Sequence, residues 1–504
     1  MTPPRPLVVA TGLLSLVVLA NLWVFSRFTV DDAFITWRYG RNLIDHGIWG
    51  YNASHFDLTQ AYTNPVFAVA SIIPAATGMD IVLFFKLVSL LTLAVLGVLF
   101  LRAAEDRVRM AFVLVLLLAI PAGVAHAFSG LETWVYGGTL ALFFVTTQRQ
   151  AWSAALACAV LLVLTRPEAW LLFALYPSIL IAARVLPREA PIARGLLVGQ
   201  IAALMAVAAL YFGFHVWQFD RFLPNTFYIK SGAGLSPAQA LRILPYTLPA
   251  LLVLAFGDRR TGLAMTLYFA AVGYSYASSD LLMNYLQRFP FQIVLPITLY
   301  LGWAVSRRDA VLRVGRGWLT LGIAVYLGAF AVHARGLGDH LGIANYYPRL
   351  LDSHVALGRT LHDLSGQNRV HAFALGDAGA PAFHADLPAL DTIVLGSRMV
   401  ADQGLTLDVV TAYAPDVVGF FADAAGIRDL PARHAALWEY VAQTGMEERC
   451  ELVYAPHYTV RLFTATDLPE LDATCARSAV LNGVDEVRYA LANLRHPPWF
   501  YWHE

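Results

Sequence analysis

Long apolar runs alternate with short polar segments over the first two thirds of the chain. Many of these runs approach the ~20 residues that a helix needs to cross a bilayer. We predict eleven spans, at residues 7–27, 80–101, 110–127, 131–146, 151–165, 168–184, 194–214, 240–256, 261–277, 288–306 and 317–334. The pattern indicates a polytopic α-helical membrane protein.

Basic residues between these runs predict the orientation of the spans. Short cytoplasmic loops collect Lys and Arg, and the basic loops all fall on one side of the eleven spans. That side is predicted to be cytoplasmic, together with the N-terminus. The first apolar run follows Arg5, as in a signal peptide, but it is long and has no clear small-residue cleavage site. We therefore expect an uncleaved anchor there.

One apolar segment, residues 64–78, does not fit this scheme. It is short, it contains Pro65 and Pro74, and counting it as a span would move the basic loop 102–109 to the outer side. We expect it to be re-entrant, or packed in the outer half of the membrane, where non-helical backbone must be buried in protein. It belongs to the first outer loop, residues 28–79.

The pattern changes after residue 334, where the long apolar runs end and His, Asp, Pro and Gly become more frequent. Short apolar runs at 370–375, 416–421 and 459–463 predict strands, and stretches such as 354–364 and 431–444 predict helices. An odd number of spans places this part outside the membrane. We therefore predict two domains: a transmembrane domain, 1–334, and an extracytoplasmic α/β domain, 335–504.

Composition agrees with a membrane protein. The chain has 504 residues, of which 58% are hydrophobic and 14% charged, and its mean hydropathy is +0.57; soluble proteins are ~25% charged. Its 35 basic and 35 acidic residues cancel, so nothing favours a nucleic-acid partner. Of its three cysteines, Cys158 lies in an apolar run, whereas Cys450 and Cys475 can form a disulfide if the C-terminal domain faces an oxidising compartment.

Polar residues gather on the predicted outer side. Ionisable residues at a membrane edge are candidates for function because burying them is expensive. Five outer segments contribute such residues, whereas the cytoplasmic loops are interpreted as plain basic anchors. The outer set is Asp31, Asp32, Arg38, Arg41, Glu132, Arg166, Glu168, Asp220, Arg221, Lys230 and Arg288.

These residue types suit sugar transfer from a lipid phosphate. Adjacent Asp31 and Asp32 repel each other, so one can have a raised pKa and act as a base; together they can also hold a divalent cation such as Mg²⁺, Mn²⁺ or Ca²⁺. Arg and Lys side chains can hold phosphate oxygens, and the candidates are Arg166, Lys230 and Arg288. Further candidates for contacting substrate, acceptor or metal are Glu132, Glu168, Arg38, Tyr62, Asn64 and Asn225.

Each candidate also has an ordinary structural interpretation. The aspartate pair can stabilise a helix N-terminus, Arg38 and Arg41 can lie on an interfacial helix, and Lys230 can extend toward headgroups. Asn64 can form a turn, and Tyr62 can pack in a core. Asp377 is interpreted as a turn residue at a strand end, with acceptor binding as the alternative. The scattered histidines of the C-terminal part do not have metal-ligand spacing.

Several motifs resemble those of a known family. They are DDAFITWRYGRNL (31–43), QAYTNP (60–65), SGLET (129–133), TRPEAW (165–170), LPNTFYIK (223–230) and, more weakly, ALGDAGAPAFHADLPALDTIVLG (374–396). Together they resemble the mycobacterial terminal arabinofuranosyltransferase B family. This family belongs to the GT-C class of integral membrane glycosyltransferases.

The resemblance implies a GT-C fold in a bacterial inner (plasma) membrane. It also implies a polyprenyl-phosphate donor, decaprenyl-phosphoryl-arabinose, and transfer of arabinofuranose to a cell-envelope glycan on the outer side. By matching position, Asp31 is expected at the reaction centre with Asp32 beside it. Arg166, Lys230 and Arg288 are expected to hold the donor phosphate. The stereochemical outcome stays open at this point.

Other functions are weighed against this one. A transporter or flippase for a lipid-linked sugar would place charges near the bilayer midplane and would show paired halves, whereas the charges here gather at one face. A scaffold with an outer binding domain leaves the aspartate pair unexplained. Within the enzyme class, a different lipid-phosphate sugar remains an alternative.

Overall fold

The structure is a computed structural model. It describes residues 5–54, 56–185, 191–230, 234–256, 259–279, 281, 284–307, 315–333, 337–377, 379–393, 395–423, 426–427, 434–455, 458–478 and 483–502. The chain divides into two compact units, each built from three stretches of sequence. The first contains Met1–Ser26, Phe85–Gln218 and Lys230–His340. The second contains Arg27–Phe84, Phe219–Ile229 and Leu341–Glu504.

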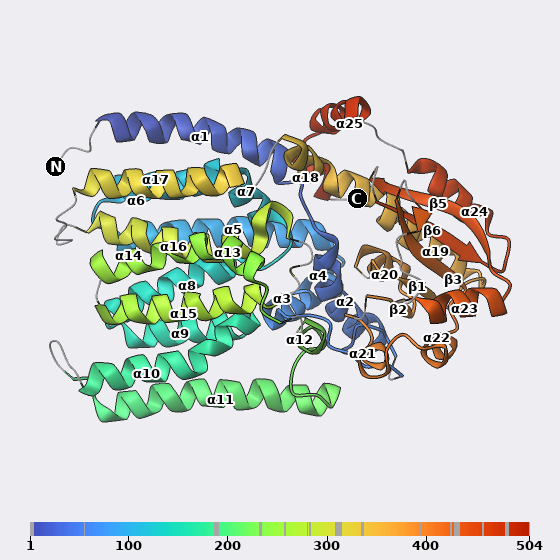
Figure 1. Cartoon of the computed structure of the whole chain (residues 1–504), viewed down its shortest axis with the longest axis horizontal. Coiled ribbons are helices and arrows are strands. Elements are labelled where there is room, and N and C mark those ends of the chain that lie inside the picture. The colour runs from blue at the N-terminus through green and yellow to red at the C-terminus, as the bar shows by residue number, and fades with distance from the viewer. Residues whose placement is uncertain are drawn as a thin grey trace. The chain divides into compact units, whose positions relative to one another are not determined.

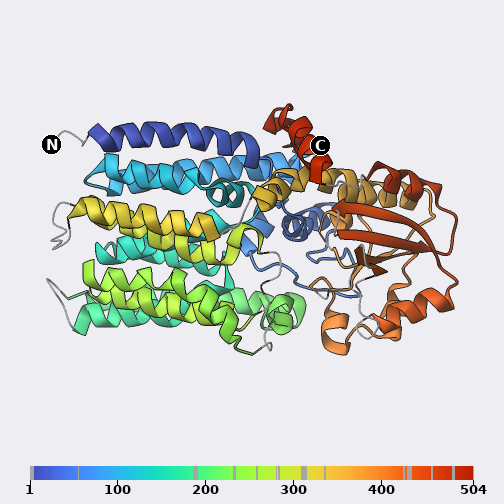
Figure 2. The same ribbon diagram turned by 45° about the horizontal axis from the view of Figure 1, so that its top comes forward.

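The first unit is helical. Figures 1 and 2 show its long helices side by side and roughly parallel. The helices of this unit, long and short, are α1 (Arg5–Phe25), α5 (Ile81–Ala103), α6 (Arg107–Ala119), α7 (Pro121–Phe128), α8 (Thr133–Gln148), α9 (Trp152–Val163), the 3₁₀ helix η1 (Pro167–Leu171) with α10 (Leu172–Val185), α11 (Arg194–Phe219), α13 (Pro237–Thr247), α14 (Pro249–Phe256), α15 (Arg259–Ala277), the short η2 (Tyr285–Gln287), α16 (Arg288–Ser306) and α17 (Arg316–His333).

Helices lie at each of the eleven predicted positions within the described part of the chain. By length and composition, six of the described helices can cross a membrane, or seven if the bent pair α6–α7 is one span. Three further apolar helices among the described residues, Pro65–Thr77, Trp152–Val163 and Gly317–Val332, are shorter. The polytopic helical class is confirmed, and the number of eleven spans stays a prediction.

The predicted span 110–127 is not one straight helix. It breaks at Ile120, whose φ of −83° and ψ of 136° are extended, and α6 and α7 meet there at an angle of 78°. The cause is Pro121, because a proline ring disfavours the helical conformation of the residue before it. Pro121 signals this break in the sequence, but the prediction of a single span followed the hydrophobic pattern alone.

Helix α16 forms the centre of the first unit. Its whole apolar window is buried, and it packs against α6, α8, α13, α14 and α17. Glycines allow the close approach: a Cβ at Gly137 of α8 would overlap Leu295, and one at Gly302 would overlap Val113 of α6. Small residues at helix contacts are typical of packing in membranes.

The first-loop segment joins the second unit. Residues 31–46 form α2 (Asp31–His46), and the segment 64–78 forms two short helices, α3 (Pro65–Ala70) and α4 (Ile72–Thr77), which pack on α2. Gly40 of α2 lies so close to Ser71 that its N–H donates to Ser71 Oγ at 3.1 Å. The re-entrant or membrane-packed position of this segment stays a prediction.

The C-terminal stretch contributes a six-stranded mixed sheet. Its strands are β1 (Phe373–Leu375), β2 (Ala389–Asp391), β3 (Val417–Asp423), β4 (Gly426–Ile427), β5 (Glu447–Ala455) and β6 (Tyr458–Thr464). The order is β2-β1-β3-β6-β5, with β4 paired to β3; β1 is parallel to β2 and β3, and β6 is antiparallel to β3 and β5. Strands lie at all three predicted positions.

Helices cover both faces of this sheet (Figure 1). One face packs against α2, α19 (Ala356–Gly366), α20 (Ala380–Ala385) and α24 (Pro469–Arg477), and the other against α21 (Arg398–Gln403), α22 (Leu407–Tyr413) and α23 (Ala435–Gln443). Val417 belongs to the first core and its neighbour Val418 to the second, as the alternation of side chains along a strand requires. The predicted C-terminal α/β region is confirmed.

The remaining elements are α12 (Asn225–Lys230), α18 (Leu337–Leu350), the π-helix η3 (Leu351–Val355), α25 (Gly483–Leu494) and η4 (Pro498–Trp502).

The structure contains a disulfide between Cys450 of β5 and Cys475 of α24, with Cα atoms 6.2 Å apart. The predicted domain boundary after residue 334 concerns which segments lie in the membrane, and it stays a prediction.

Candidate functional site

Both first-loop aspartates lie in the first turn of α2. Val30 occupies the N-cap position and makes no side-chain capping bond, so neither aspartate is the cap. The helix dipole still favours acidic groups in a first turn. Asp31 is buried, with 4% of its surface exposed, whereas Asp32 is half-buried.

The Asp31 carboxylate is bound by the backbone of the loop that follows β1. Its Oδ2 accepts the N–H of Gly379 at 3.1 Å, and its Oδ1 accepts the N–H of Ala380 at 2.6 Å. A Cβ at Gly379 would overlap the backbone oxygen and the carboxylate of Asp31, so only glycine fits there. The weakly matched GDAG stretch therefore holds the first-loop aspartate.

A second buried carboxylate, Asp377, begins the same loop. Its Oδ2 lies 2.5 Å from Nε2 of His354, and Tyr458 donates its hydroxyl to both carboxylate oxygens, at 2.7 and 2.8 Å. His354 belongs to the π-helix η3, and its Nδ1 lies 2.9 Å from Ser353 Oγ. Asp31, His354 and Asp377 form the cluster that we call the acidic centre.

The hydrogen bonds fix where the protons of this centre lie. Ser353 donates its only hydroxyl hydrogen to the carbonyl of Arg349 at 2.6 Å, so its oxygen can only accept from His354 Nδ1. Nδ1 therefore carries a hydrogen. Nε2 contacts an Asp377 oxygen that also accepts from Tyr458 and therefore acts as an acceptor. The arrangement thus suits an imidazolium, with a hydrogen on each ring nitrogen, facing a carboxylate.

Burial and charge displace the pKa values in the acidic centre. Burial raises the pKa of Asp31 to about 7, Asp377 and Asp32 act in the same direction, and His354 and the N–H of Ala380 oppose them. Burial alone would lower the pKa of His354, but the charge and hydrogen bond of Asp377, with a smaller effect of Asp31, raise it. A carboxylate that titrates near neutral pH suits a general base.

Four other candidates in the second unit make structural contacts. Asn64 caps α3 by accepting the N–H of Phe67 at 3.2 Å, and the hydroxyl of Tyr62 accepts from Trp49 Nε1 at 3.2 Å. Asn225 donates to the carbonyls of Leu395 and Ser397 at 3.1 and 3.2 Å.

Arg38 is also buried in the second unit, with 1% of its surface exposed. It donates to the carbonyl of Leu387 at 2.5 Å, and its guanidinium lies 4.8 Å from the centre of the Tyr51 ring. The geometry fits the structural interpretation of these residues, and their roles at substrate or acceptor stay predictions.

The sequence interpretation missed Asp57. This buried carboxylate accepts the hydroxyls of Ser397 and Tyr413, both at 2.5 Å, and the N–H of Arg398 at 2.9 Å. It thus joins the first loop to the start of α21. His354 was missed as well, because its partner Asp377 lies on a separate element.

The first unit contains a second buried charge cluster. Arg166, at the break between α9 and η1, donates Nε and Nη2 to the two oxygens of Glu168 at 2.9 and 2.7 Å, and Nη1 to Glu132. Tyr276 donates to Glu168 at 3.2 Å. The structure thus brings Glu132, Arg166 and Glu168 together, with the guanidinium engaged by both carboxylates.

The other two predicted phosphate ligands lie at helix ends. Arg288 is the first residue of α16, is 9% exposed, and lies over the Phe289 ring at 5.2 Å. Lys230 ends α12, but its side chain lies outside the described residues. Phosphate binding by Arg166, Lys230 and Arg288 stays a prediction.

No group of three or more His, Cys, Asp and Glu side chains placed to hold a metal ion occurs among the described residues. The possible cation site at Asp31 and Asp32 therefore gains no third ligand of this kind within the described ranges.

Comparison with known proteins identifies the fold. The structure is similar to two crystal structures of ArnT from Cupriavidus metallidurans, both with a TM-score of 0.52. The one bound to undecaprenyl phosphate is 15% identical and matches over 91% of this chain and 98% of ArnT; the apo one is 17% identical over 94% and 100%. The predicted GT-C fold is confirmed by this similarity. The sequence matches no family model and no curated protein sequence.

Proposed function

We propose that the protein is a glycosyltransferase that uses a polyprenyl-phosphate-linked sugar as its donor. The observation that carries the proposal is the fold, which is shared over nearly the whole chain with a protein whose crystal structure holds undecaprenyl phosphate. The buried Asp31 and the basic residues of the outer segments supply the chemistry. Orientation with this chemistry on the extracytoplasmic side is part of the proposal.

Asp31 is proposed as the group that receives the acceptor's proton. The acceptor hydroxyl oxygen forms a bond to the anomeric carbon of the donor while the bond from that carbon to the phosphate oxygen breaks. The electron pair leaves with the polyprenyl phosphate, and the hydroxyl proton passes to the Asp31 carboxylate. Such assistance typically contributes ~10²–10⁴-fold to a rate. The base role corresponds to inversion at the anomeric carbon.

Basic side chains are proposed to stabilise the departing phosphate. The candidates are Arg166, Lys230 and Arg288 of the outer segments. Fixed positive groups at a developing negative charge lower the barrier of group transfer. Asp32 is proposed to contact the sugar beside Asp31.

The motif resemblance supports arabinofuranose as the sugar, moved from decaprenyl-phosphoryl-arabinose onto a cell-envelope glycan. A second candidate is transfer of another sugar from a lipid phosphate, and it is supported by the similarity to ArnT bound to undecaprenyl rather than decaprenyl phosphate. Both share the proposed role of Asp31 and differ in donor sugar and lipid length.

The test is sugar transfer by the purified full chain in nanodiscs. Synthetic polyprenyl-phosphoryl-arabinose is the donor, a short arabinan is the acceptor, and products are read by mass spectrometry with and without EDTA. We expect transfer by wild type, loss of at least ~10²-fold in Asp31→Asn, and little change in the control Glu439→Gln on the exposed side of α23.

Full activity of a folded Asp31→Asn variant would refute the site. Wild-type transfer only from a donor that carries another sugar would favour the second candidate. Absence of transfer from every lipid-phosphate sugar, with the donor bound, would refute the proposed function.

A further inference from the structure

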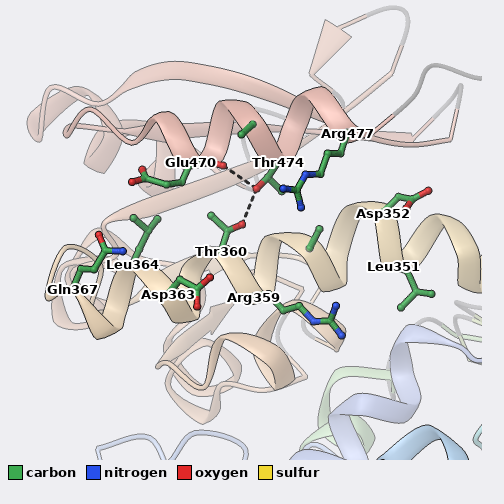
Figure 3. Close-up of a pocket in the computed structure, with 12 residues that line it drawn as sticks. Leu351, Asp352, Arg359, Thr360, Asp363, Leu364, Gln367, Glu470, Thr474 and Arg477 are labelled. Carbon is green, nitrogen blue, oxygen red and sulfur yellow. Dashed lines mark hydrogen bonds between the residues drawn. The ribbon is translucent and has the colours of Figure 1, made fainter. Parts of the chain in front are cut away.

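A polar groove lies in the second unit between the helical stretch η3–α19 and helix α24 (Figure 3). Its volume is about 540 Å³, within the ~300–1,000 Å³ typical of ligand pockets. It is lined by Leu351, Asp352, Ala356, Arg359, Thr360, Asp363, Leu364, Gln367, Glu470, Ala473, Thr474 and Arg477.

Hydrogen-bonding groups of both kinds line this groove. Three acidic side chains and two arginines nearly balance in charge, and Gln367, Thr360 and Thr474 add neutral donors and acceptors. Figure 3 shows that Thr360 and Thr474 meet from the two walls. An apolar chain would leave these polar groups desolvated without partners, and a phosphate would face the acidic side chains.

The hydrogen bonds between the walls leave an acceptor for a ligand. Thr474 donates its hydroxyl hydrogen to the carbonyl of Glu470 at 2.9 Å, so at the 2.7 Å contact between the two threonines Thr360 must donate to Thr474. The Thr360 oxygen then has lone pairs that can accept from a ligand hydroxyl. A sugar hydroxyl, which both donates and accepts, matches such a surface.

We propose that this groove binds a stretch of the acceptor glycan, as a neutral oligosaccharide subsite apart from the acidic centre. The proposal rests on the proposed function and names its acceptor class. The π-helix η3 forms the start of one wall: Leu351 and Asp352 line the groove, and His354 of the same segment contacts Asp377. π-helical turns are frequent at functional sites. A glycan in the groove thus contacts the same five-residue segment that supplies the imidazolium of the acidic centre.

Binding to the full chain in nanodiscs tests the subsite. The probes are a short linear arabino-oligosaccharide and a manno-oligosaccharide of equal length, and calorimetry measures the affinity. Ala473→Trp fills the groove without removing a polar group, and Ala435→Trp, on the exposed start of α23, is its matched control. A second variant, Gln367→Ala, removes one donor and acceptor.

We expect the wild type and Ala435→Trp to bind one of the two oligosaccharides with equal affinity. Ala473→Trp should bind the same oligosaccharide at least tenfold more weakly, with an unchanged melting temperature. We also expect a higher KM for the long acceptor with kcat nearly unchanged in Gln367→Ala. No binding of either probe by wild type, or equal binding by both tryptophan variants, would overturn the subsite. Transfer activity is scored separately: transfer without groove-dependent binding refutes only the subsite, whereas groove-dependent binding without transfer from any lipid donor refutes only the proposed function.

Discussion

His354 and Asp377 are joined by a hydrogen bond of 2.5 Å between Nε2 of one side chain and Oδ2 of the other. Both are buried, and both act on Asp31 through their charges. With the imidazolium present, the acidic centre holds one positive group against two carboxylates. This arrangement lets Asp31 ionise in a setting where burial alone would keep it protonated.

The first prediction concerns the pH profile of transfer. Because the proposed base role requires an ionised Asp31, the rate should rise with pH through about 7, the pKa to which burial raises Asp31. His354 lowers that pKa, so His354→Gln should move the rising limb to higher pH. The measurement is kcat/KM across a pH series with wild type, His354→Gln and Glu439→Gln.

A structural role of His354 alone would lower the rate at every pH and leave the midpoint in place. An unchanged midpoint in a folded His354→Gln variant would therefore contradict the electrostatic role.

The second prediction concerns stability. The pKa of Asp31 is raised from 3.8 to about 7 in the folded protein, so below about pH 4 both states are protonated and the shift has no effect. Between these values the unfolded chain has lost a proton that the folded chain retains, and stability falls as pH rises. The raised pKa of His354 acts in the same direction, since its stabilising charge is lost at higher pH. Asp31→Asn should therefore lose less melting temperature than wild type between pH 5 and pH 8; parallel curves would contradict this.

The third prediction concerns the charge cluster of the first unit. Arg166→Ala leaves Glu132 and Glu168 buried without their cation, which typically costs about 3–5 kcal/mol. Arg166→Lys keeps the charge but loses the two-pronged contact with Glu168, so an intermediate loss is expected. Thermal unfolding of the purified protein measures both. A fully stable Arg166→Lys with weaker donor binding would instead favour the phosphate role.

The fourth prediction concerns Gly379. Its Cβ position is occupied by Asp31, so Gly379→Ala must displace the carboxylate or the loop. Misplacement by ~1 Å can cost ~10²-fold in rate, and a loss of this order is expected. Gly342→Ala, at an open position of α18, is the matched control because nothing lies within 4 Å of its added Cβ. Equal activity of the two variants would refute the positioning of Asp31 by this loop.

Local pattern predicted most of the architecture. The apolar runs located the helices because bilayer crossing sets their length and composition. The short apolar run at 416–421 located the strand whose Val417 and Val418 face opposite cores. The bend at Ile120 was missed although Pro121 signalled it.

The candidate site was predicted only in part. The pair Asp31 and Asp32 was singled out because the two carboxylates are adjacent and follow an apolar run, both local features, and the motif resemblance then selected Asp31. Its actual partners, Gly379 and Ala380, are joined to it by long-range packing that no local pattern contains. The same is true of His354 with Asp377, and of Asp57 with Tyr413.

The hydrogen bond from Gly379 to Asp31 joins residues 348 positions apart. During synthesis, the segment with Asp31 leaves the ribosome first, and its binding loop follows only after the first unit's helices have been made. Until then the carboxylate has neither its backbone donors nor the neighbouring imidazolium. The second unit can close only when the last third of the chain arrives, so a prematurely terminated chain contains the aspartate but not the setting that gives it its proton affinity.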